Sequence, residues 1–127
     1  MFRRAIPTSQ QRRLLQVSLD WCRPKDPPLS LGHASILANL SANNIPFDQL
    51  SLAVNKADFD VSSVVEWVMA KTSNEVVPST TDFAIGAFVW NDVYAIEIMK
   101  KLRLRDFRGR IIVGGPQVSY VSYPVLS

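Results

Sequence analysis

Four short β-prone stretches alternate with three helix-prone stretches along this 127-residue chain, and this alternation constrains the fold more than any other feature. The β-prone stretches cover residues 13–19, 49–54, 83–89 and 110–113, and the helix-prone stretches cover residues 30–43, 60–71 and about 92–102. Strands that are separated by helices are connected by right-handed crossovers, so the pattern βαβαβαβ predicts one parallel sheet.

Local signals support these boundaries. Ser30 and Asp60 stand where helix N-caps are expected, and Pro46 ends the first helical stretch because the residue before proline avoids the α region. Within that stretch, apolar or small residues recur at helical spacing at Ala34, Leu37, Ala38 and Ser41. Residues 83–89 are nearly all apolar or small, which is typical of a strand covered on both faces. We therefore expect one three-layer α/β domain of the Rossmann or flavodoxin type over residues 1–127.

Composition excludes several classes of protein. With one cysteine and one histidine, the chain alone can form no disulfide, no Cys/His zinc site and no cysteine-bound iron–sulfur cluster. The basic N-terminus, residues 1–7, has no apolar core behind it, so it is no signal peptide. No uncharged apolar run reaches the roughly 18 residues of a membrane span, and we expect a cytoplasmic protein.

A cluster of cations lies near the end of the third helical stretch. Lys100, Lys101, Arg103, Arg105, Arg108 and Arg110 fall within eleven residues, opposed by Asp106 alone. One interpretation is the solvated end of a helix, where cations suit the negative end of the helix dipole. The other is a surface that binds an anion or phosphate. The net charge of +3 is too small to indicate a nucleic-acid-binding protein.

In this type of fold, ligands bind outside the carboxyl ends of the strands. The relevant loops cover residues 20–30, 90–92 and 114–120. None has the glycine pattern of a dinucleotide-binding turn or a P-loop. The first loop lacks the glycine- and hydroxyl-rich run of a flavin phosphate site, and the third strand does not end in the aspartate of a phosphoacceptor domain.

Three segments in this order resemble the cobalamin-binding domain of B12-dependent radical-SAM proteins. They are Ser-Leu-Gly-His-Ala-Ser-Ile-Leu-Ala at 30–38, Gly-Ala-Phe-Val-Trp-Asn at 86–91 and Ile-Ile-Val-Gly-Gly-Pro-Gln at 111–117. The similarity covers residues 13–120. It implies a cobalamin cofactor and a site formed by Trp90, Asn91, Gly114, Gly115, Pro116 and Gln117.

These residues also have structural interpretations. Gly114 and Gly115 would let the backbone approach a ligand, or would form a turn that needs a positive φ. Asn91 would donate to a corrin amide or cap the third helix. Trp90 would face the ligand or form a corner of the core.

His33 is not expected to bind cobalt. Methyltransferase and mutase relatives use a histidine in an Asp-x-His-x-x-Gly motif, whereas this chain has Leu31 two residues before His33 and Ile36 three residues after it. His33 is therefore expected at a partly buried or surface position of the helix, and we predict no metal site.

The chain also departs from that family. The radical-SAM cluster requires C-x-x-x-C-x-x-C, and Cys22 is the only cysteine, so the resemblance implies a non-catalytic module. The family domain continues beyond a fourth strand, whereas this sequence ends in a short β-prone tail at 117–127, so we expect a truncated domain. The alternative is a cofactor-free interaction or assembly protein that keeps the fold. A small enzyme is disfavoured because no Ser/His/Asp set, Cys/His pair or carboxylate dyad can be placed at the strand ends.

The fourth strand is expected at an edge of the sheet, where unpaired backbone groups promote pairing with another chain. The tail has strand-like alternation at Val118, Tyr120, Val121 and Tyr123. We therefore expect a homodimer that uses the fourth strand, the tail or both, and the alternative is a tail that covers its own edge. A radical-SAM domain or chain is a second expected partner.

Overall fold

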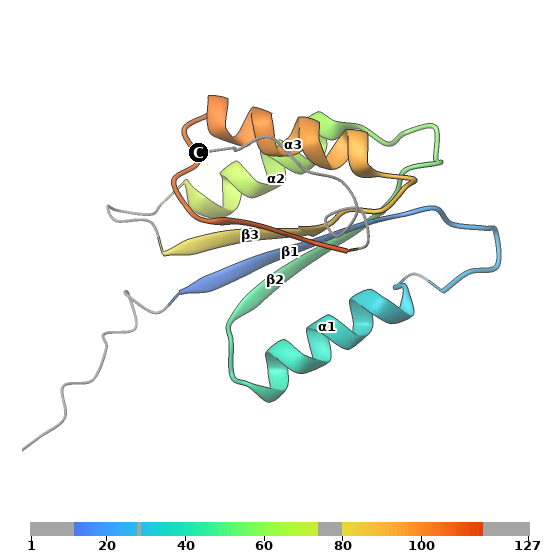
Figure 1. Ribbon diagram of the computed structural model, residues 1–127, viewed down its shortest axis with the longest axis horizontal. Helices are drawn as coiled ribbons and strands as arrows, with labels where there is room; N and C mark the ends of the chain where they lie inside the picture. The colour runs from blue at the N-terminus through green and yellow to red at the C-terminus, as the bar shows by residue number, and fades with distance from the viewer. Residues whose placement is uncertain (1–11, 28, 74–79, 116–127) are drawn as a thin grey trace, which may run out of the picture.

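The computed structural model describes residues 12–27, 29–73 and 80–115, and it confirms the alternating order of elements (Figure 1). The elements are β1 (Arg13–Asp20), α1 (Leu31–Ala42), β2 (Phe47–Ala53), α2 (Val61–Thr72), β3 (Thr81–Gly86), α3 (Asp92–Leu104) and β4 (Ile111–Gly114). Ser30 and Asp60 cap α1 and α2 as expected, accepting from the N–H groups of His33 and Ser62. In these described ranges no helix is long and apolar enough to cross a membrane.

All four strands are parallel, in the spatial order β2-β1-β3-β4. This is the order of a flavodoxin-like sheet, so the predicted fold class is confirmed. The chain runs outward from β1 to β2 and then returns past β1 to β3. The direction of winding therefore reverses between β1 and β3, and this switch point is where such folds bind ligands.

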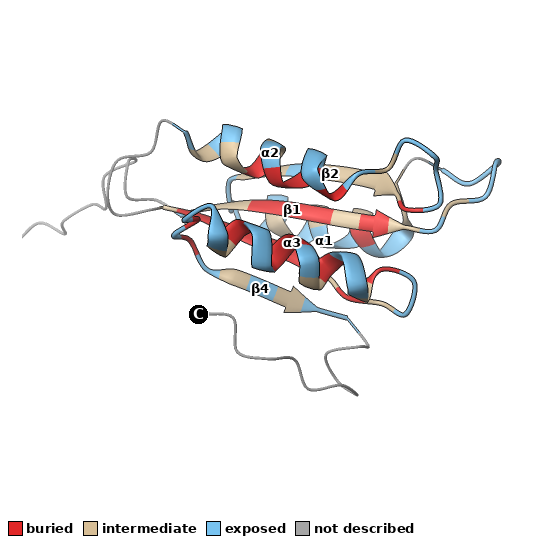
Figure 2. Ribbon diagram, turned by 90° about the horizontal axis from the view of Figure 1, so that it is seen from above, coloured by how far each residue is buried: buried red, intermediate tan, exposed pale blue. Residues whose placement is uncertain are grey.

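The hydrophobic core lies on one face of the sheet, beneath α2 and α3 (Figures 1 and 2). Alternate residues of β1 point into it, because successive side chains of a strand face opposite sides. The core is formed by Leu15, Val17, Leu19, Phe83 and Ile85 of the strands, Val61, Val64, Val65 and Val68 of α2, and Ala95, Ile98, Met99 and Leu102 of α3. Burial of these side chains stabilises the domain by about 1.5–3 kcal/mol for each large residue.

The opposite face of the sheet is polar and lightly covered. α1 lies alone on this side (Figure 1), and His33 is its one buried residue. The apolar or small residues expected to face the sheet from α1 are only partly the right ones, since Ala38 and Ser41 are exposed. The least exposed positions of α1 are His33, Ala34, Leu37 and Leu40. The helix therefore turns a histidine toward the sheet, because the strand residues beneath it are polar as well.

Most strand boundaries differ from the expectation by one to three residues, with the largest differences at the start of β2 and at the two ends of β3. β2 begins at Phe47, two residues earlier than predicted, because Phe47 pairs with Leu14 and the Pro46 carbonyl accepts from the Leu14 N–H. β3 ends at Gly86 rather than at residue 89. The Phe88 N–H bonds to the side chain of Asn91, which leads the backbone out of the ladder and into a turn.

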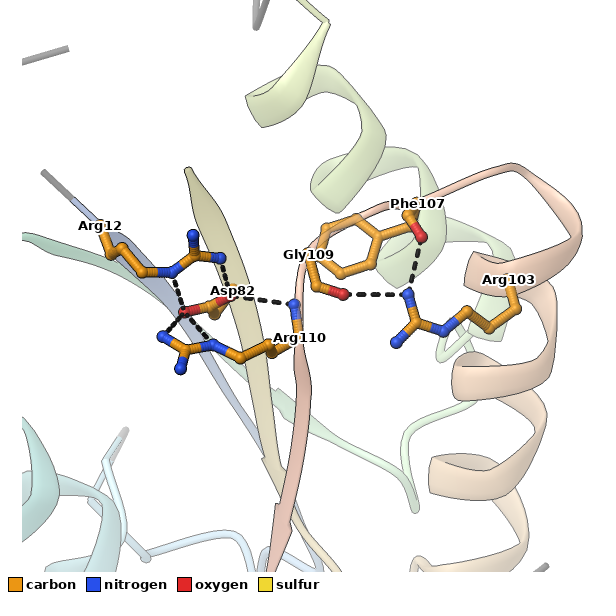
Figure 3. Close-up of polar contacts among 6 residues, drawn as sticks. All are labelled: Arg12, Asp82, Arg103, Phe107, Gly109 and Arg110. Carbon is orange, nitrogen blue, oxygen red and sulfur yellow. Dashed lines mark hydrogen bonds and ion pairs between the residues drawn. The ribbon is translucent and has the colours of Figure 1, made fainter. Parts of the chain in front are cut away.

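A buried carboxylate fixes the amino end of the sheet (Figure 3). Asp82, in the second position of β3, accepts from the guanidinium groups of Arg12 and Arg110 and from the Arg110 N–H. Burial alone would raise the pKa of Asp82, but the hydrogen bonds from Arg12 and Arg110 outweigh it and hold that pKa well below its usual value. This cluster joins the amino ends of β3 and β4 to Arg12, the residue before β1.

The cations near the end of α3 have intramolecular partners. Arg103 donates to the carbonyls of Phe107 and Gly109 (Figure 3), while Arg105 pairs with Glu66 of α2. Lys101 and Arg108 pair with Glu97 and Asp106, and Arg110 pairs with Asp82. Since most of these charges are already compensated, the structure favours the solvated helix end over an anion-binding surface.

We expect Asp82→Asn to lower the free energy of unfolding at neutral pH by about 2 kcal/mol, because charge-assisted hydrogen bonds are lost. The pKa of Asp82 lies below its usual 3.8 in the folded chain, so its stabilising effect is full above that value and is lost as the pH falls. In urea unfolding, the difference between wild type and variant should therefore shrink on acidification from about pH 5 to pH 2.

The matched control is Asp106→Asn, which removes the carboxylate of the exposed pair with Arg108 and should change stability little. A difference between wild type and Asp82→Asn that stays constant across this pH range would refute the role assigned to the carboxylate.

Candidate functional site

Two adjacent side chains join the carboxyl ends of β1 and β3. Trp90 Nε1 donates to the Leu19 carbonyl at 3.0 Å, and Asn91 Nδ2 donates to the same carbonyl at 2.8 Å. Asn91 Nδ2 also donates to the Gly86 carbonyl at 3.1 Å, and its Oδ1 accepts from the Phe88 N–H at 2.8 Å. These bonds span the switch point, so the two strands are held together where they would otherwise diverge.

Asn91 consequently has a role that neither sequence interpretation described. It occupies the N-cap position of α3, but its side chain makes no capping bond to the helix. The residue is 1% exposed, and both ends of its carboxamide bond to backbone. The expectation of a side-chain cap is therefore wrong, and Asn91 is not among the residues that line the neighbouring cavity.

A cavity of about 530 Å³ lies beside this junction, on the face of the sheet that carries α1. It extends over β1, β3 and β4 toward their carboxyl ends, with one side of α1 as a wall. Its volume is within the range of about 300–1,000 Å³ that is typical of small-molecule sites. Both its size and its place at the switch point match a ligand site in this class of fold.

Small residues create the floor of this cavity. Gly86 of β3 pairs with Gly114 of β4, and Ala84 pairs with Ile112 one step earlier on the same face. A side chain added at Gly114 would meet nothing within 4 Å. The space above β3 and β4 therefore exists because three of these four positions carry little or no side chain.

The two glycines after β4 have different roles. Gly115 has a φ of +97°, and a Cβ there would lie 2.6 Å from the Ala87 carbonyl oxygen, so a turn requires glycine. Gly114 has no such constraint and lines the cavity. Of the sequence-predicted site, Trp90, Gly114 and Gly115 line one cavity, while Pro116 and Gln117 lie outside the described residues.

An aromatic pair lines another part of the cavity. The rings of Phe88 and Trp90 are stacked, with centroids 4.7 Å apart and planes 2° from parallel. Trp90 is 40% exposed although its Nε1 bonds to Leu19. Trp90 therefore bonds to the backbone at the end of β1 and also lines the cavity. The structural interpretation and the cavity-facing interpretation of this residue are thus compatible.

Polar groups of β1 form the remaining side, and the sequence analysis missed them. Gln16, Ser18 and Asp20 line the cavity, while Leu15, Val17 and Leu19 between them enter the core. The Ser18 hydroxyl lies 3.0 Å and 3.1 Å from the two carboxylate oxygens of Asp20. The signal in the sequence is this alternation of polar and apolar residues, in a central strand where both faces would ordinarily be apolar.

His33 projects from α1 toward the same polar face. It is buried, and its Nε2 lies 3.0 Å from Gln49 Oε1 of β2, while Nδ1 has no hydrogen-bond partner. Over the described ranges, the structure contains no group of three or more His, Cys, Asp or Glu side chains that could hold a metal ion. His33 is thus buried, whereas a partly buried or surface position of the helix was expected.

Apolar side chains surround the carboxyl edge of the sheet. Trp21 after β1 is 62% exposed, Leu31 at the start of α1 is 84% exposed and Val89 after β3 is 77% exposed. Trp90 and Val93 continue this set at the start of α3. These five exposed residues, which stand just after β1 and β3 or at the start of α1 and α3, are here called the apolar rim.

A second cavity of about 720 Å³ lies near the carboxyl end of β2. Its wall includes Cys22, whose backbone N–H and carbonyl both bond to the Asn55 side chain, at 3.0 Å and 2.7 Å. Charges of both signs line it, from Arg23 and Lys56 to Asp58. We favour the smaller cavity as the functional site because it lies at the switch point and its walls combine small, aromatic and buried polar groups.

Comparison of the chain with protein-family models, with curated proteins and with solved structures found no match. The function must therefore be argued from the geometry of the site.

Proposed function

We propose that this chain is a non-catalytic ligand-binding module for a large, flat and mostly apolar cofactor, with cobalamin as the ligand that the sequence resemblance suggests. The proposal rests on the cavity at the switch point, which is floored by Ala84, Gly86 and Gly114. One of its walls, Trp90, is also a residue of the apolar rim. One arm of the cofactor would enter the cavity while its ring covers the rim.

The chemistry of these surfaces suits such a ligand. Sites for cofactors are mostly apolar, with a small number of polar groups that fix orientation. The rim supplies exposed apolar area from Trp21, Leu31 and Val89, and the cavity supplies polar groups from Gln16 and Asp20. A corrin ring with peripheral amides and a nucleotide arm presents both kinds of surface.

The arrangement of polar side chains supports a binding role over catalysis. Covalent catalysis needs a nucleophile hydrogen-bonded to a general base. Ser18 instead bonds to Asp20 along its own strand, and the buried His33 bonds to Gln49. Among the described residues that line the cavity, no hydroxyl group bonds to the histidine ring, so the groups present can orient a ligand without activating a nucleophile.

The test is retention of hydroxocobalamin through gel filtration at micromolar protein, read from the visible spectrum of the protein peak. Wild type should retain the cofactor, and Gly114→Val should lose it because the added side chain enters the cavity floor. Valine suits a strand, so the variant should keep its melting temperature within a few degrees. Gly115→Val is unsuitable as a probe because it would strain the turn at that residue.

Leu104→Ser serves as the control. Leu104 is an exposed apolar residue at the far end of α3, so its loss should leave cofactor retention unchanged unless binding is nonspecific. Failure of folded wild type to retain hydroxocobalamin, or full retention by Gly114→Val, would refute cobalamin binding at this site.

A second candidate function is assembly, and the edge of the sheet favours it. Within the described ranges β4 pairs with β3 alone, so one row of its N–H and C=O groups is free for another strand. Ile112 on this strand is 47% exposed. We propose that two copies associate through β4, since symmetric dimers are the commonest assemblies. The tail at 117–127 that was expected to contribute lies outside the described residues.

Light scattering at tens of micromolar protein tests this assembly. We expect the mass of a dimer for the full chain. Ile112→Lys should shift the protein toward monomer, because a charge at an edge strand opposes pairing. A monomeric wild-type chain at that concentration would exclude the dimer, and a dimer unaffected by Ile112→Lys would exclude β4 as its interface.

A further inference from the structure

Gln16 carries a carboxamide that faces the cavity. It lies in the central strand β1, the residue is 6% exposed, and it lines the cavity at the switch point. Its carboxamide makes no hydrogen bond to the residues that the structure describes, although most buried polar side chains are bonded. Unlike the fully buried Nδ1 of His33, the carboxamide atoms keep access to the cavity. Both the donor and the acceptor of Gln16 are therefore available to a ligand there.

The neighbouring strand provides an internal comparison. Gln49 of β2 is the register partner of Gln16 on the same face of the sheet, and its Oε1 bonds to Nε2 of His33 at 3.0 Å. The two glutamines therefore share residue type, register and face but differ in surroundings. Gln49 is exposed and holds His33 through its Oε1, whereas Gln16 is buried against the cavity and makes no hydrogen bond to a described residue.

The geometry of a carboxamide specifies its complement. It carries a donor beside an acceptor in one plane, and it pairs at two points with a group that offers an acceptor beside a donor. The amino-purine edge of adenine is such a group, and glutamine is a known partner for it. The stacked rings of Phe88 and Trp90 line the same cavity and offer an aromatic surface to a flat base.

The rest of the β1 wall extends this match. Asp20 lies four residues beyond Gln16 on the same face, a span of about 13 Å along the strand. Its carboxylate, already bonded to Ser18, accepts hydrogen bonds from hydroxyl groups. A base at Gln16 and a hydroxylated sugar directed toward Asp20 would together follow the strand from the interior of the cavity to its mouth.

We propose that the cavity binds an adenine nucleoside, either free or as the arm of a larger cofactor, with Gln16 pairing with the base and Asp20 accepting from the sugar hydroxyls. The proposal rests on the small-molecule-binding role proposed above and adds the chemical class of the group that enters the cavity. Hydroxocobalamin carries a benzimidazole and no adenine, so its retention would depend on the rim and the cavity walls and not on pairing with Gln16.

Calorimetric titration of the full chain with adenosine tests the base, with purine riboside as the analogue that lacks the exocyclic amino group. Adenosine should bind with a dissociation constant below about 1 mM, and purine riboside about tenfold more weakly, since one hydrogen bond is lost and Gln16 is left half paired. Equal affinity for the two nucleosides would overturn the pairing with Gln16.

Two matched variants separate recognition from structure. Gln16→Leu should abolish the preference for adenosine while the melting temperature stays level or rises, because no hydrogen bond of the free protein is lost. Gln49→Leu should lower the melting temperature, because His33 loses its partner, and should keep the preference for adenosine. A lowered melting temperature and an unchanged preference in Gln16→Leu would assign Gln16 a purely structural role and overturn the proposal.

Parallel gel filtration with hydroxocobalamin distinguishes this inference from the proposed function. Binding of adenosine without retention of cobalamin supports the nucleoside site and contradicts cobalamin as the cofactor. If wild type retains cobalamin, and adenosine neither binds to the protein nor displaces the cobalamin, the nucleoside site alone is contradicted. Absence of both contradicts both.

Discussion

The carboxyl ends of β1 and β3 depend on the hydrogen bonds that the carboxamide of Asn91 makes. In a doubly wound sheet the connections leave β1 and β3 in opposite directions, and the pairing of these two strands ends at Val17 and Ile85. Beyond that point Asn91 bonds to the carbonyls of Leu19 and Gly86 and to the N–H of Phe88 at once. Without Asn91, the Gly86 carbonyl and the Phe88 N–H would lose this partner, at a cost of about 1–3 kcal/mol each. The cavity beside the junction can stay open because this side chain, and not a ligand, holds the strands together.

The two faces of the sheet contribute unequally to stability. α2 and α3 cover an apolar face that contains the main core, with Phe83, Leu15 and Ile98 fully buried. α1 covers a face of glutamines, serines and small residues, where hydrophobic burial is slight. One face can carry unpaired polar groups and empty space because the other, together with the Asp82 cluster, supplies most of the stability. Such separation is expected where a binding site weakens the fold locally.

Much of this architecture could be predicted from local signals in the sequence. The alternation of strand and helix patterns and the caps at Ser30 and Asp60 depend on neighbours in the chain, and they are confirmed. The site could be predicted only in part. Trp90, Gly114 and Gly115 line the cavity, whereas Asn91 is turned into the backbone by contacts with Leu19, a residue 72 positions away. Such contacts depend on strand order, which no local pattern contains.

The polar wall was missed for a related reason. Gln16, Ser18 and Asp20 alternate with the core residues Leu15, Val17 and Leu19, but this alternation alone does not show that a cavity lies on the polar face. Their meaning also depends on register, since the pairing of Gln16 with Gln49 and with Ala84 distinguishes an unsatisfied carboxamide beside a cavity from a satisfied one beneath a helix. Register between strands is set by tertiary packing, so a single sequence could not supply it.

The central claim is that the space beside the Asn91 junction is a preformed ligand site. Hydrogen exchange of the full chain with and without hydroxocobalamin tests it most directly, because exchange reports which backbone amides a bound ligand protects. A ligand in this space should slow exchange at residues 86–90 and 112–115, which line or adjoin the cavity, and leave exchange in the middle of α2 unchanged. Protection centred instead on residues 55–60, beside the second cavity, or no change at the carboxyl ends of β3 and β4, would contradict it.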